Sequence, residues 1–347
     1  MKPPLVTVLM PVYNTAKYLK EAIDSILTQT YTSFEFVIID DASTDASVSI
    51  VQSYKDSRIK LFVKPQNTGY TTSLNMGLEV AKGKYIARMD GDDISTIDRL
   101  EKQVAFLEQQ TDIAVCGSWY EYIGGKKIIE LPSTHDEIKV ALLTYCAMGH
   151  PTVMLRNSFL KENQLKYNIE NEPAEDYDLW ARISTVGRLA NIPEVLLHYR
   201  IHANQVSTLQ TAKQQSISHN VGIQLLMTLE PIFKIDLNFL RIDVTRNCSF
   251  NKFIFWIRQL DNLHYLNTNK KLFNIILFNA FILKAKKNLC TSFFQSPNSN
   301  TLKYFFLVLI QERQCFFHVS PIAILKYTIK CMLFWSKTKK RVKGNNH

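Results

Sequence analysis

The chain has 347 residues, of which 46% are hydrophobic and 21% charged, and its net charge is +10 at pH 7. This balance excludes collagen-like and disordered chains, and the length is sufficient for two domains. Residues 1–200 hold 21 Lys and Arg against 26 Asp and Glu, a balance of −5, whereas residues 201–347 hold 20 against 5, a balance of +15. Two parts of opposite charge predict two different tasks.

Up to residue 116 the hydrophobic pattern alternates between short β-rich runs and segments with helical spacing. The predicted strands are residues 5–10, 34–39, 59–63, 85–89 and 113–116. The predicted helices are residues 18–27, 45–54, 71–81 and 96–109. This alternation predicts an α/β fold, a mostly parallel sheet flanked by helices, whose ligand lies outside the carboxyl ends of the strands.

Beyond residue 117 the pattern changes. Residues 120–131 predict a β-hairpin that turns at Gly124 and Gly125. The next predicted elements are a strand at residues 151–155, a helix at residues 176–185 and a strand at residues 195–201. From about residue 218 the apolar residues recur mostly at helical spacing, which predicts a mainly helical C-terminal region.

The six cysteines are scattered, with no Cys-x-x-Cys pair and no zinc-like histidine cluster (Cys116, Cys146, Cys248, Cys290, Cys315, Cys331). This arrangement predicts free thiols in a reducing compartment. The first residues do not form a signal-peptide pattern, and no run reaches the roughly 18–20 apolar residues of a membrane-spanning helix. We therefore expect a cytoplasmic protein.

Polar residues follow the first three predicted strands. After the first come Pro11, Val12, Tyr13 and Asn14. Their backbone N–H groups begin a helix and can attract phosphate, although a plain strand-to-helix turn is the alternative. After the second strand, Asp40 can accept hydrogen bonds from a base or a ribose, whereas Asp45 is expected to cap the next helix. Asn67 and Asn75 follow the third strand; Asn75 faces either a ligand or solvent.

Three carboxylates, Asp90, Asp92 and Asp93, stand within four positions after the fourth strand. Like charges this close repel, and Mg²⁺ or Mn²⁺ held by carboxylate and phosphate oxygens would relieve the repulsion. An acidic turn that caps the next helix is the alternative. Arg88, inside this buried strand, needs a partner, which is either a phosphate or a neighbouring carboxylate.

Glu175 and Asp176 precede an amphipathic helix, and one of them is a candidate general base for a hydroxyl group. Acids that only stabilise the helix N-terminus are the alternative. Further on, alternation along a strand places His198, Arg200 and His202 on one face, where they suit a diphosphate or a metal; a solvated edge strand is the alternative.

Taken together, these segments resemble the family 2 inverting glycosyltransferases with the GT-A fold. The matching segments are VTVLMPVYNTAKYLKEAIDSILTQTY, FVIIDDASTD, NTGYTTSLNMGLEVAKGKYIARMDGDD, AEDYDLWARI and HYRIHANQVS. They lie in the order of the family and span roughly residues 4–208. The resemblance implies two domains, a GT-A domain at residues 1–208 and a basic helical domain at residues 209–347.

For the donor site, the resemblance implies that residues 11–14 line the nucleotide pocket and that Asp40 contacts the base. Asp90-Gly91-Asp92 looks like the D-x-D motif, with Asp92 on the metal (Mn²⁺ or Mg²⁺) and Asp90 on ribose or sugar. Asp93 would lie near the metal or the donor sugar, and His202 near the diphosphate or the metal. The donor implied is a nucleotide sugar, most simply a UDP-sugar.

For the acceptor site, the resemblance implies that Asp176 is the catalytic base, with Glu175 beside it. Trp180 is expected either near the acceptor or in the core. The implied acceptor is a saccharide or a lipid-linked saccharide in a bacterial surface-polysaccharide or lipopolysaccharide pathway.

The C-terminal region predicts a basic amphipathic helix within residues 321–343. Ile322, Leu325, Ile329, Met332 and Leu333 share its apolar face, and Lys326, Lys330 and Lys337 lie off that face, followed by Lys339, Lys340 and Arg341. Such a helix can bind an anionic cytoplasmic membrane surface peripherally, and a core helix with a basic surface is the alternative.

Two other functions compete with sugar transfer. A nucleotidylyltransferase usually needs a glycine-rich loop after the first strand, and residues 10–17 hold no glycine. An anion-binding or nucleic-acid-binding protein built on the basic C-terminal half is the second. Its basic residues are dispersed, however, and no nucleic-acid-binding signature is present, so a nucleic acid is not an expected partner.

Overall fold

The computed structural model of the protein describes residues 5–125, 127–202, 205, 210–228, 249–295, 321, 322 and 324–329. The chain divides into two compact units, residues 1–225 and residues 226–347. The domain boundary expected at residue 208 stays a prediction. Among the described residues, none of the helices combines the length and the hydropathy needed to cross a bilayer.

The first unit is built on one mixed sheet. Its strands are β1 Val6–Val12, β2 Phe34–Asp40, β3 Ile59–Val63, β4 Tyr85–Arg88, β5 Ile94–Ser95, β6 Ile113–Tyr122, β7 Ile128–Ile129, β8 Met154–Arg156 and β9 Arg188–Tyr199. The sheet order is β3-β2-β1-β4-β8-β6-β9-β5, with β7 paired to β6. Strands β3, β2, β1 and β4 are parallel, and β8 runs antiparallel to both β4 and β6.

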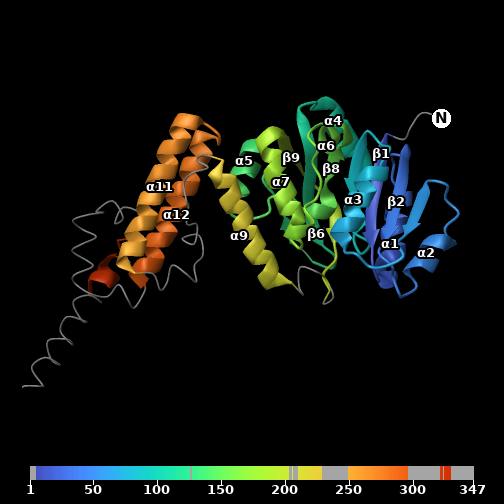
Figure 1. Cartoon of the computed structure of the whole chain (residues 1–347), viewed down its shortest axis with the longest axis horizontal. Coiled ribbons are helices and arrows are strands. Elements are labelled where there is room, and N and C mark those ends of the chain that lie inside the picture. Colours follow the sequence, from blue (N-terminus) through green and yellow to red (C-terminus); the bar gives the residue numbers. More distant parts are fainter. Residues whose placement is uncertain are drawn as a thin grey trace, which may run out of the picture. The chain divides into compact units, whose positions relative to one another are not determined.

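Helices flank this sheet on both faces, as the alternating pattern predicts. They are α1 Ala16–Leu27, α2 Ser47–Ser53, α3 Tyr70–Val80, α4 Arg99–Gln109, α5 His135–Ala141, α6 Asn157–Glu162, α7 Glu175–Val186 and α9 Thr211–Met227, with the 3-10 turns η1 His150–Thr152 and η2 Ile169–Asn171. Figure 1 shows α3 beside β1 and β2.

The two faces of β1 pack against different helices because side chains alternate along a strand. Val8 and Met10 belong to a core cluster that includes residues of α1, α2 and α4. On the opposite face, a Cβ atom at Gly77 of α3 would lie 2.1 Å from the side chain of Leu9, so only glycine allows this close approach. Each fully buried aliphatic side chain contributes about 1.5–3 kcal/mol, which holds the strands in this arrangement.

The element boundaries differ from the sequence prediction in several places. Strand β1 runs to Val12, so Pro11 and Val12 belong to the strand and do not begin a helix, and β6 continues to Tyr122. Residues 150–152 form a 3-10 turn that begins at His150, so the strand expected at 151–155 starts only at Met154. Helix α4 begins at Arg99 rather than at residue 96, because Ile94 and Ser95 first pair with β9. The last strand, β9, is longer than expected at its start, since its register with β6 shifts around residue 193 and pairing then continues.

The hairpin expected at residues 120–131 is confirmed by the antiparallel pairs Tyr120–Ile129 and Glu121–Ile128. Gly69 has a φ of +92°, a value that favours glycine, and it precedes α3 directly. Both features position loops at the end of the sheet where the functional side chains lie.

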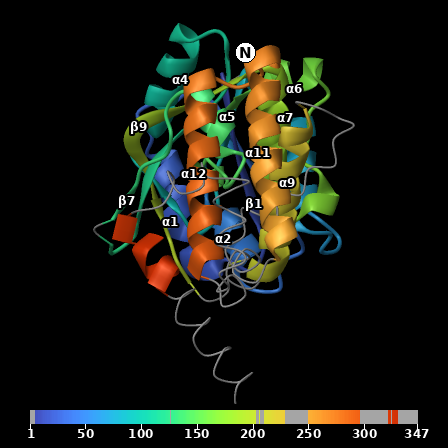
Figure 2. The same cartoon turned by 90° about the vertical axis from the view of Figure 1, so that its left-hand side faces the viewer.

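The described part of the second unit contains two long helices, α11 Phe250–Lys270 and α12 Ile275–Gln295, which lie side by side (Figure 2). Ser249 caps α11 by accepting a hydrogen bond from the Lys252 N–H. The buried Asn267 side chain bonds both the N–H and the C=O of Phe273 and so fixes the connection between the helices. Phe253 and Phe293 stack with their ring centroids 4.2 Å apart. The predicted helical character is confirmed for these residues.

Some predictions about the C-terminal half fall on residues that the structure does not describe. Residues 321, 322 and 324–329 are helical, as expected. The remaining members of the predicted amphipathic helix and three cysteines lie outside the described residues (Lys330, Met332, Leu333, Lys337, Lys339, Lys340, Arg341, Cys248, Cys315, Cys331). Cys116, Cys146 and Cys290 form no disulfide, as predicted.

Candidate active site

A cleft with a volume of about 900 Å³ opens where strands β1 and β4 end, at the edge of the sheet that the sequence predicts. Twelve of the predicted catalytic, substrate-binding and metal-binding residues line it: Pro11, Val12, Tyr13, Asn14, Asn67, Arg88, Asp90, Gly91, Asp92, Glu175, Asp176 and His202. Five of them do not: Asp40, Asn75, Asp93, Trp180 and Arg200. A cleft of this size can enclose a ligand as large as a nucleotide sugar.

Asn14 joins the carboxyl ends of β1 and β2. Its φ of +52° turns the chain out of β1, and its Oδ1 accepts hydrogen bonds from the backbone N–H groups of Thr44 and Asp45. Its own N–H donates to the Ser43 hydroxyl. The segment at residues 11–14 is therefore fixed against the loop after β2.

Asp40 and Asp41 face different surroundings, although they are neighbours in the chain. Asp40 ends β2, is buried, and accepts a hydrogen bond from the Ser43 N–H. Asp41 lines the cleft, where it accepts from the Thr68 N–H and pairs with Lys64. The role expected for Asp40 stays a prediction, and Asp41 is the carboxylate of the two that lines the cleft, although its side chain is only 3% exposed beside Lys64.

The three carboxylates after β4 form one acidic turn, Asp90, Asp92 and Asp93, with oxygen atoms within 4.8 Å of one another. Arg88 is buried and pairs with Asp90, and His202 Nε2 lies 2.8 Å from Asp92 Oδ2. Arg200 braces the turn from outside the cleft, through its N–H to Asp93 and its side chain to the Asp92 carbonyl.

The acidic turn fits a hard divalent cation. Burial and the neighbouring Asp90 and Asp92 raise the pKa of Asp93 well above its usual range. Burial and Asp90 likewise raise the pKa of Asp92. The Asp93 Oδ2 atom is buried and has no hydrogen-bond partner. Oxygen ligands, an unpartnered carboxylate oxygen and mutual repulsion are the features that Mg²⁺ or Mn²⁺ would satisfy.

Glu175 and Asp176 begin helix α7 and form the second carboxylate cluster, the Glu175–Asp176 pair. Tyr70 donates a hydrogen bond of 2.6 Å to Glu175, and Cys146 Sγ lies 3.6 Å from Asp176 Oδ2. Burial and Asp176 raise the pKa of Glu175 to about 8, and burial also raises the pKa of Asp176. Asp176 keeps 19% of its side chain exposed against 3% for Glu175, so Asp176 is the acid that a ligand can reach.

Two nominated side chains are used by the fold instead of a ligand. Asn75 makes a two-way pair with the backbone N–H and C=O of Tyr167. Trp180 is fully buried in the core. Neither is positioned to contact a molecule in the cleft.

The prediction that His198, Arg200 and His202 share one face of a strand is wrong. Strand β9 ends at Tyr199, and His198 pairs with Glu121 at 2.9 Å. Arg200 and His202 lie beyond the strand, where the chain wraps around the acidic turn.

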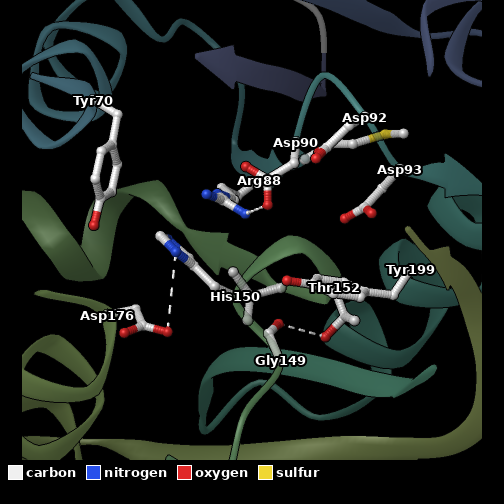
Figure 3. Close-up of polar contacts among 12 residues, drawn as sticks. Tyr70, Arg88, Asp90, Asp92, Asp93, Gly149, His150, Thr152, Asp176 and Tyr199 are labelled. Atoms are coloured by element: carbon white, nitrogen blue, oxygen red, sulfur yellow. Dashed lines mark hydrogen bonds and ion pairs between the residues drawn. The ribbon is translucent and has the colours of Figure 1, made fainter. Parts of the chain in front are cut away.

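Sequence reasoning missed several cleft residues: Tyr18, Asp41, Tyr70, Cys146 and His150. Tyr70 had a usable signal, since it starts the helix that follows the positive-φ Gly69. His150 lies in the segment Met148-Gly149-His150-Pro151, to which no role was assigned. Figure 3 shows His150 between the Arg88–Asp90 pair and Asp176.

The chain is similar to known proteins in sequence and in structure. The sequence model of glycosyl transferase family 2 matches residues 7–174. An uncharacterized glycosyltransferase of Haemophilus influenzae is 37% identical over 63% of this chain and 72% of its own length. Another, from Methanocaldococcus jannaschii, is 37% identical over 62% of this chain and 77% of its own length.

Solved structures share the fold. S. aureus TarS in complex with UDP-GlcNAc has a TM-score of 0.54 at 18% identity, covering 83% of this chain and 86% of that structure. The mannosyltransferase PcManGT from Pyrobaculum calidifontis, in complex with GDP-Man and Mn²⁺, has a TM-score of 0.53 at 16% identity. The match covers 98% of this chain and 87% of that structure. These likenesses confirm the expected GT-A type of fold.

Proposed function

The chain belongs to glycosyl transferase family 2, and from this membership we propose that it moves a sugar from a nucleoside-diphosphate sugar to an acceptor hydroxyl with inversion. The observation that carries the proposal is that one cleft contains both the acidic turn and Asp176. A site of this kind needs a place for the leaving diphosphate and a separate base, and here the first follows β4 and the second begins α7. Membership of the family favours sugar transfer over the nucleotidylyltransferase alternative.

On the donor side, residues 11–14 and Asp41 are the groups available to the nucleoside, since they line the cleft beside the end of β1. Asp92, supported by Asp90, Asp93 and His202, would hold the divalent cation. When bound, such a cation supplies positive charge to the leaving diphosphate. TarS and PcManGT were solved with UDP-GlcNAc and with GDP-Man and Mn²⁺, which supports a nucleotide-sugar donor here.

On the acceptor side, Asp176 takes the proton from the attacking hydroxyl. The hydroxyl oxygen forms a bond to the anomeric carbon while the bond from that carbon to the diphosphate oxygen breaks, and the diphosphate keeps the electron pair. Because attack and departure occur on opposite faces, the anomeric configuration inverts. The protein's part is positioning and electrostatic stabilisation, which usually supply the largest contributions to rate.

The test of this function is turnover of UDP-, GDP- and dTDP-linked sugars, with Mn²⁺ or Mg²⁺ against EDTA, for the wild type and for Asp92→Asn and Asp176→Asn. We expect one class of donor to be hydrolysed or transferred only with metal, and both variants to be inactive. If the wild type turns over no donor in either metal, the proposal fails. The base of the active donor then also decides whether the expected UDP-sugar is correct.

We also propose that the C-terminal part binds an anionic membrane surface, where a lipid-linked saccharide acceptor of a surface-polysaccharide or lipopolysaccharide pathway would reside. Three residues of the predicted apolar face, Ile322, Leu325 and Ile329, are 67%, 60% and 47% exposed. The +15 balance of residues 201–347 complements an anionic surface. Apolar side chains left in water beside basic ones favour an interfacial helix over a core helix.

Co-flotation with vesicles that contain phosphatidylglycerol tests the membrane proposal. We expect the full chain to float, and the triple variant Ile322→Ser, Leu325→Ser, Ile329→Ser to float much less. Equal flotation of the two chains, or flotation on neutral vesicles alone, would contradict it.

A further inference from the structure

His150 lies in the cleft between the two carboxylate clusters, outside every motif that the family resemblance covers. It begins the turn η1, directly before strand β8, and its side chain is only 10% exposed. The ring packs against Tyr167 at a centroid distance of 5.3 Å and meets the edge of Trp180 at 6.1 Å. Packing on both sides fixes the ring plane, and with it the directions in which the two nitrogen atoms point.

Each ring nitrogen of His150 faces a different group. Nε2 lies 3.0 Å from the hydroxyl of the buried Tyr167. Nδ1 lies 3.7 Å from Glu175 Oε1 and 4.0 Å from Asp176 Oδ2. A lone pair on Nδ1 would point at two acids, so the stable tautomer carries its proton on Nδ1 and accepts the Tyr167 O–H on Nε2.

The ring is neutral at neutral pH. Burial, and next the positive charge of Arg88, lower the pKa of His150 well below its usual range. A neutral ring can direct an N–H dipole at a carboxylate without forming an ion pair with it. An imidazolium in the same place would stabilise the ionised acid so strongly that it would lose basicity.

We propose that His150 is a positioning residue for the catalytic base: its Nδ1–H, aligned by Tyr167, holds Asp176 ionised and aimed at the acceptor hydroxyl. This inference rests on the proposed function of the cleft. The two distances from Nδ1 are longer than hydrogen bonds, and contacts of this kind in a ligand-free site commonly tighten when substrate binds.

Other groups also act on the same acids, and a pH experiment must take them into account. Tyr70 donates to Glu175, the Tyr177 N–H donates to Asp176 at 2.7 Å, and Cys146 contacts Asp176. Arg88 acts through space and opposes the rise that burial causes in the pKa of both Glu175 and Asp176. None of these groups changes when His150 is replaced, so a shift in the pH profile reports the ring itself.

Two substitutions separate the role of the N–H from the role of the ring's bulk. His150→Leu fills the space but removes the donor. His150→Asn places an amide N–H close to the position of Nδ1. The matched control is His135→Asn. Burial also lowers the pKa of this histidine, to about 4, and its ring accepts the Leu189 N–H outside the cleft.

The measurement is the pH profile of hydrolysis of UDP-GlcNAc and GDP-mannose with Mn²⁺, in which water takes the place of the acceptor. For His150→Leu we expect kcat at pH 7 to fall about 10- to 100-fold and the acid limb to move up by about one pH unit, with the donor KM unchanged. His150→Asn should restore the position of the acid limb, and His135→Asn should leave it in place.

An unmoved acid limb in His150→Leu overturns the inference while leaving the proposed function intact, whereas a wild type that hydrolyses neither donor counts against the function. The tautomer gives a test without activity. Nitrogen-15 spectra of the substrate-free protein should show His150 neutral and protonated on Nδ1 at pH 7. An Nε2–H tautomer or an imidazolium overturns the inference in either case.

Discussion

The two carboxylate clusters of the cleft differ in what surrounds them. In the acidic turn, Asp90 has Arg88 and Asp92 has His202, yet three carboxylates still lie within 4.8 Å of one another. In the Glu175–Asp176 pair, the hydrogen-bond donors are uncharged: the Tyr70 hydroxyl, the Cys146 thiol and the Tyr177 N–H. In the acidic turn, the carboxylates repel one another and a cation can relieve this repulsion. In the Glu175–Asp176 pair, no cationic side chain among the described residues makes a direct contact, so a carboxylate there can accept a proton.

The largest expected effect separates chemistry from binding. Asp176→Asn removes the proton acceptor and keeps the shape, so kcat should fall about 10²- to 10⁴-fold, while donor affinity in Mn²⁺ stays within about twofold of wild type. The control is Asp178→Asn on the same helix, which breaks the pair with Arg182 and should lower stability without removing the base. Stopped-flow turnover and donor titration measure the two quantities.

The second largest effect is on donor binding rather than on the chemical step. Asp92→Asn should weaken donor binding in Mn²⁺ by about 10- to 100-fold, because the loss of a charged contact costs about 1.5–3 kcal/mol. Calorimetric titration of donor with and without Mn²⁺ checks it, with Asp98→Asn as the control, since Asp98 pairs with Lys102 away from the cleft. If the donor binds with equal affinity in Mn²⁺ and in EDTA, the acidic turn does not act through a metal, and the proposed difference between the two clusters fails.

A third effect concerns pH. Burial and Asp176 raise the pKa of Glu175 to about 8 in the folded chain, against an ordinary value of 4.5. The stability that neutral Glu175 contributes is therefore complete below about pH 4.5 and is lost as the pH rises through about 8, with a slope of at most about 1.4 kcal/mol per pH unit.

Urea unfolding between pH 5 and 9 checks this slope. Glu175→Gln should remove it, and Glu162→Gln, at an exposed position on α6, should leave it unchanged. A wild-type curve whose slope is the same as that of Glu175→Gln would show that Glu175 titrates normally in the folded protein.

The smallest expected effect tests the weakest partner of the base. Cys146 offers only a thiol at 3.6 Å from Asp176, and such contacts are worth well under 1 kcal/mol. Cys146→Ala should lower turnover at pH 7 by about two- to threefold. Cys116→Ala, a buried thiol in the sheet core, is the control and should cost stability alone. A loss of a hundredfold or more at Cys146 would place that thiol in the chemistry itself.

The fold and the acidic turn could be predicted from sequence because both are local signals. Strands such as β1 and β2 are mostly apolar runs, and Asp90, Asp92 and Asp93 lie within four positions of the chain. Glu175 and Asp176 also begin a helix with a clear apolar face. In each case the residues that determine the local structure are close together in the chain, so the pattern can be recognised without the fold.

The remaining site residues depend on contacts that the sequence does not encode locally. His150 reaches the base only because η1 and α7 meet across the cleft. Asp40 and Asp41 are indistinguishable in sequence, and the alternation at the end of β2 decides which one lines the cleft. Asn75 resembles a ligand-facing residue until its pairing with the Tyr167 backbone is seen. The C-terminal half has helical spacing but no motif, so its partner could not be inferred from spacing alone.

Strand β8 has only three residues, Met154–Arg156, yet it is the antiparallel link between β4 and β6. A ribosome releases residues 6–88, with the four parallel strands, long before it releases β8 and the start of α7. The half that ends in the acidic turn can therefore take shape while the half that holds Asp176 is still being synthesised. A chain truncated before residue 154 would have the acidic turn but would lack β8 and Asp176.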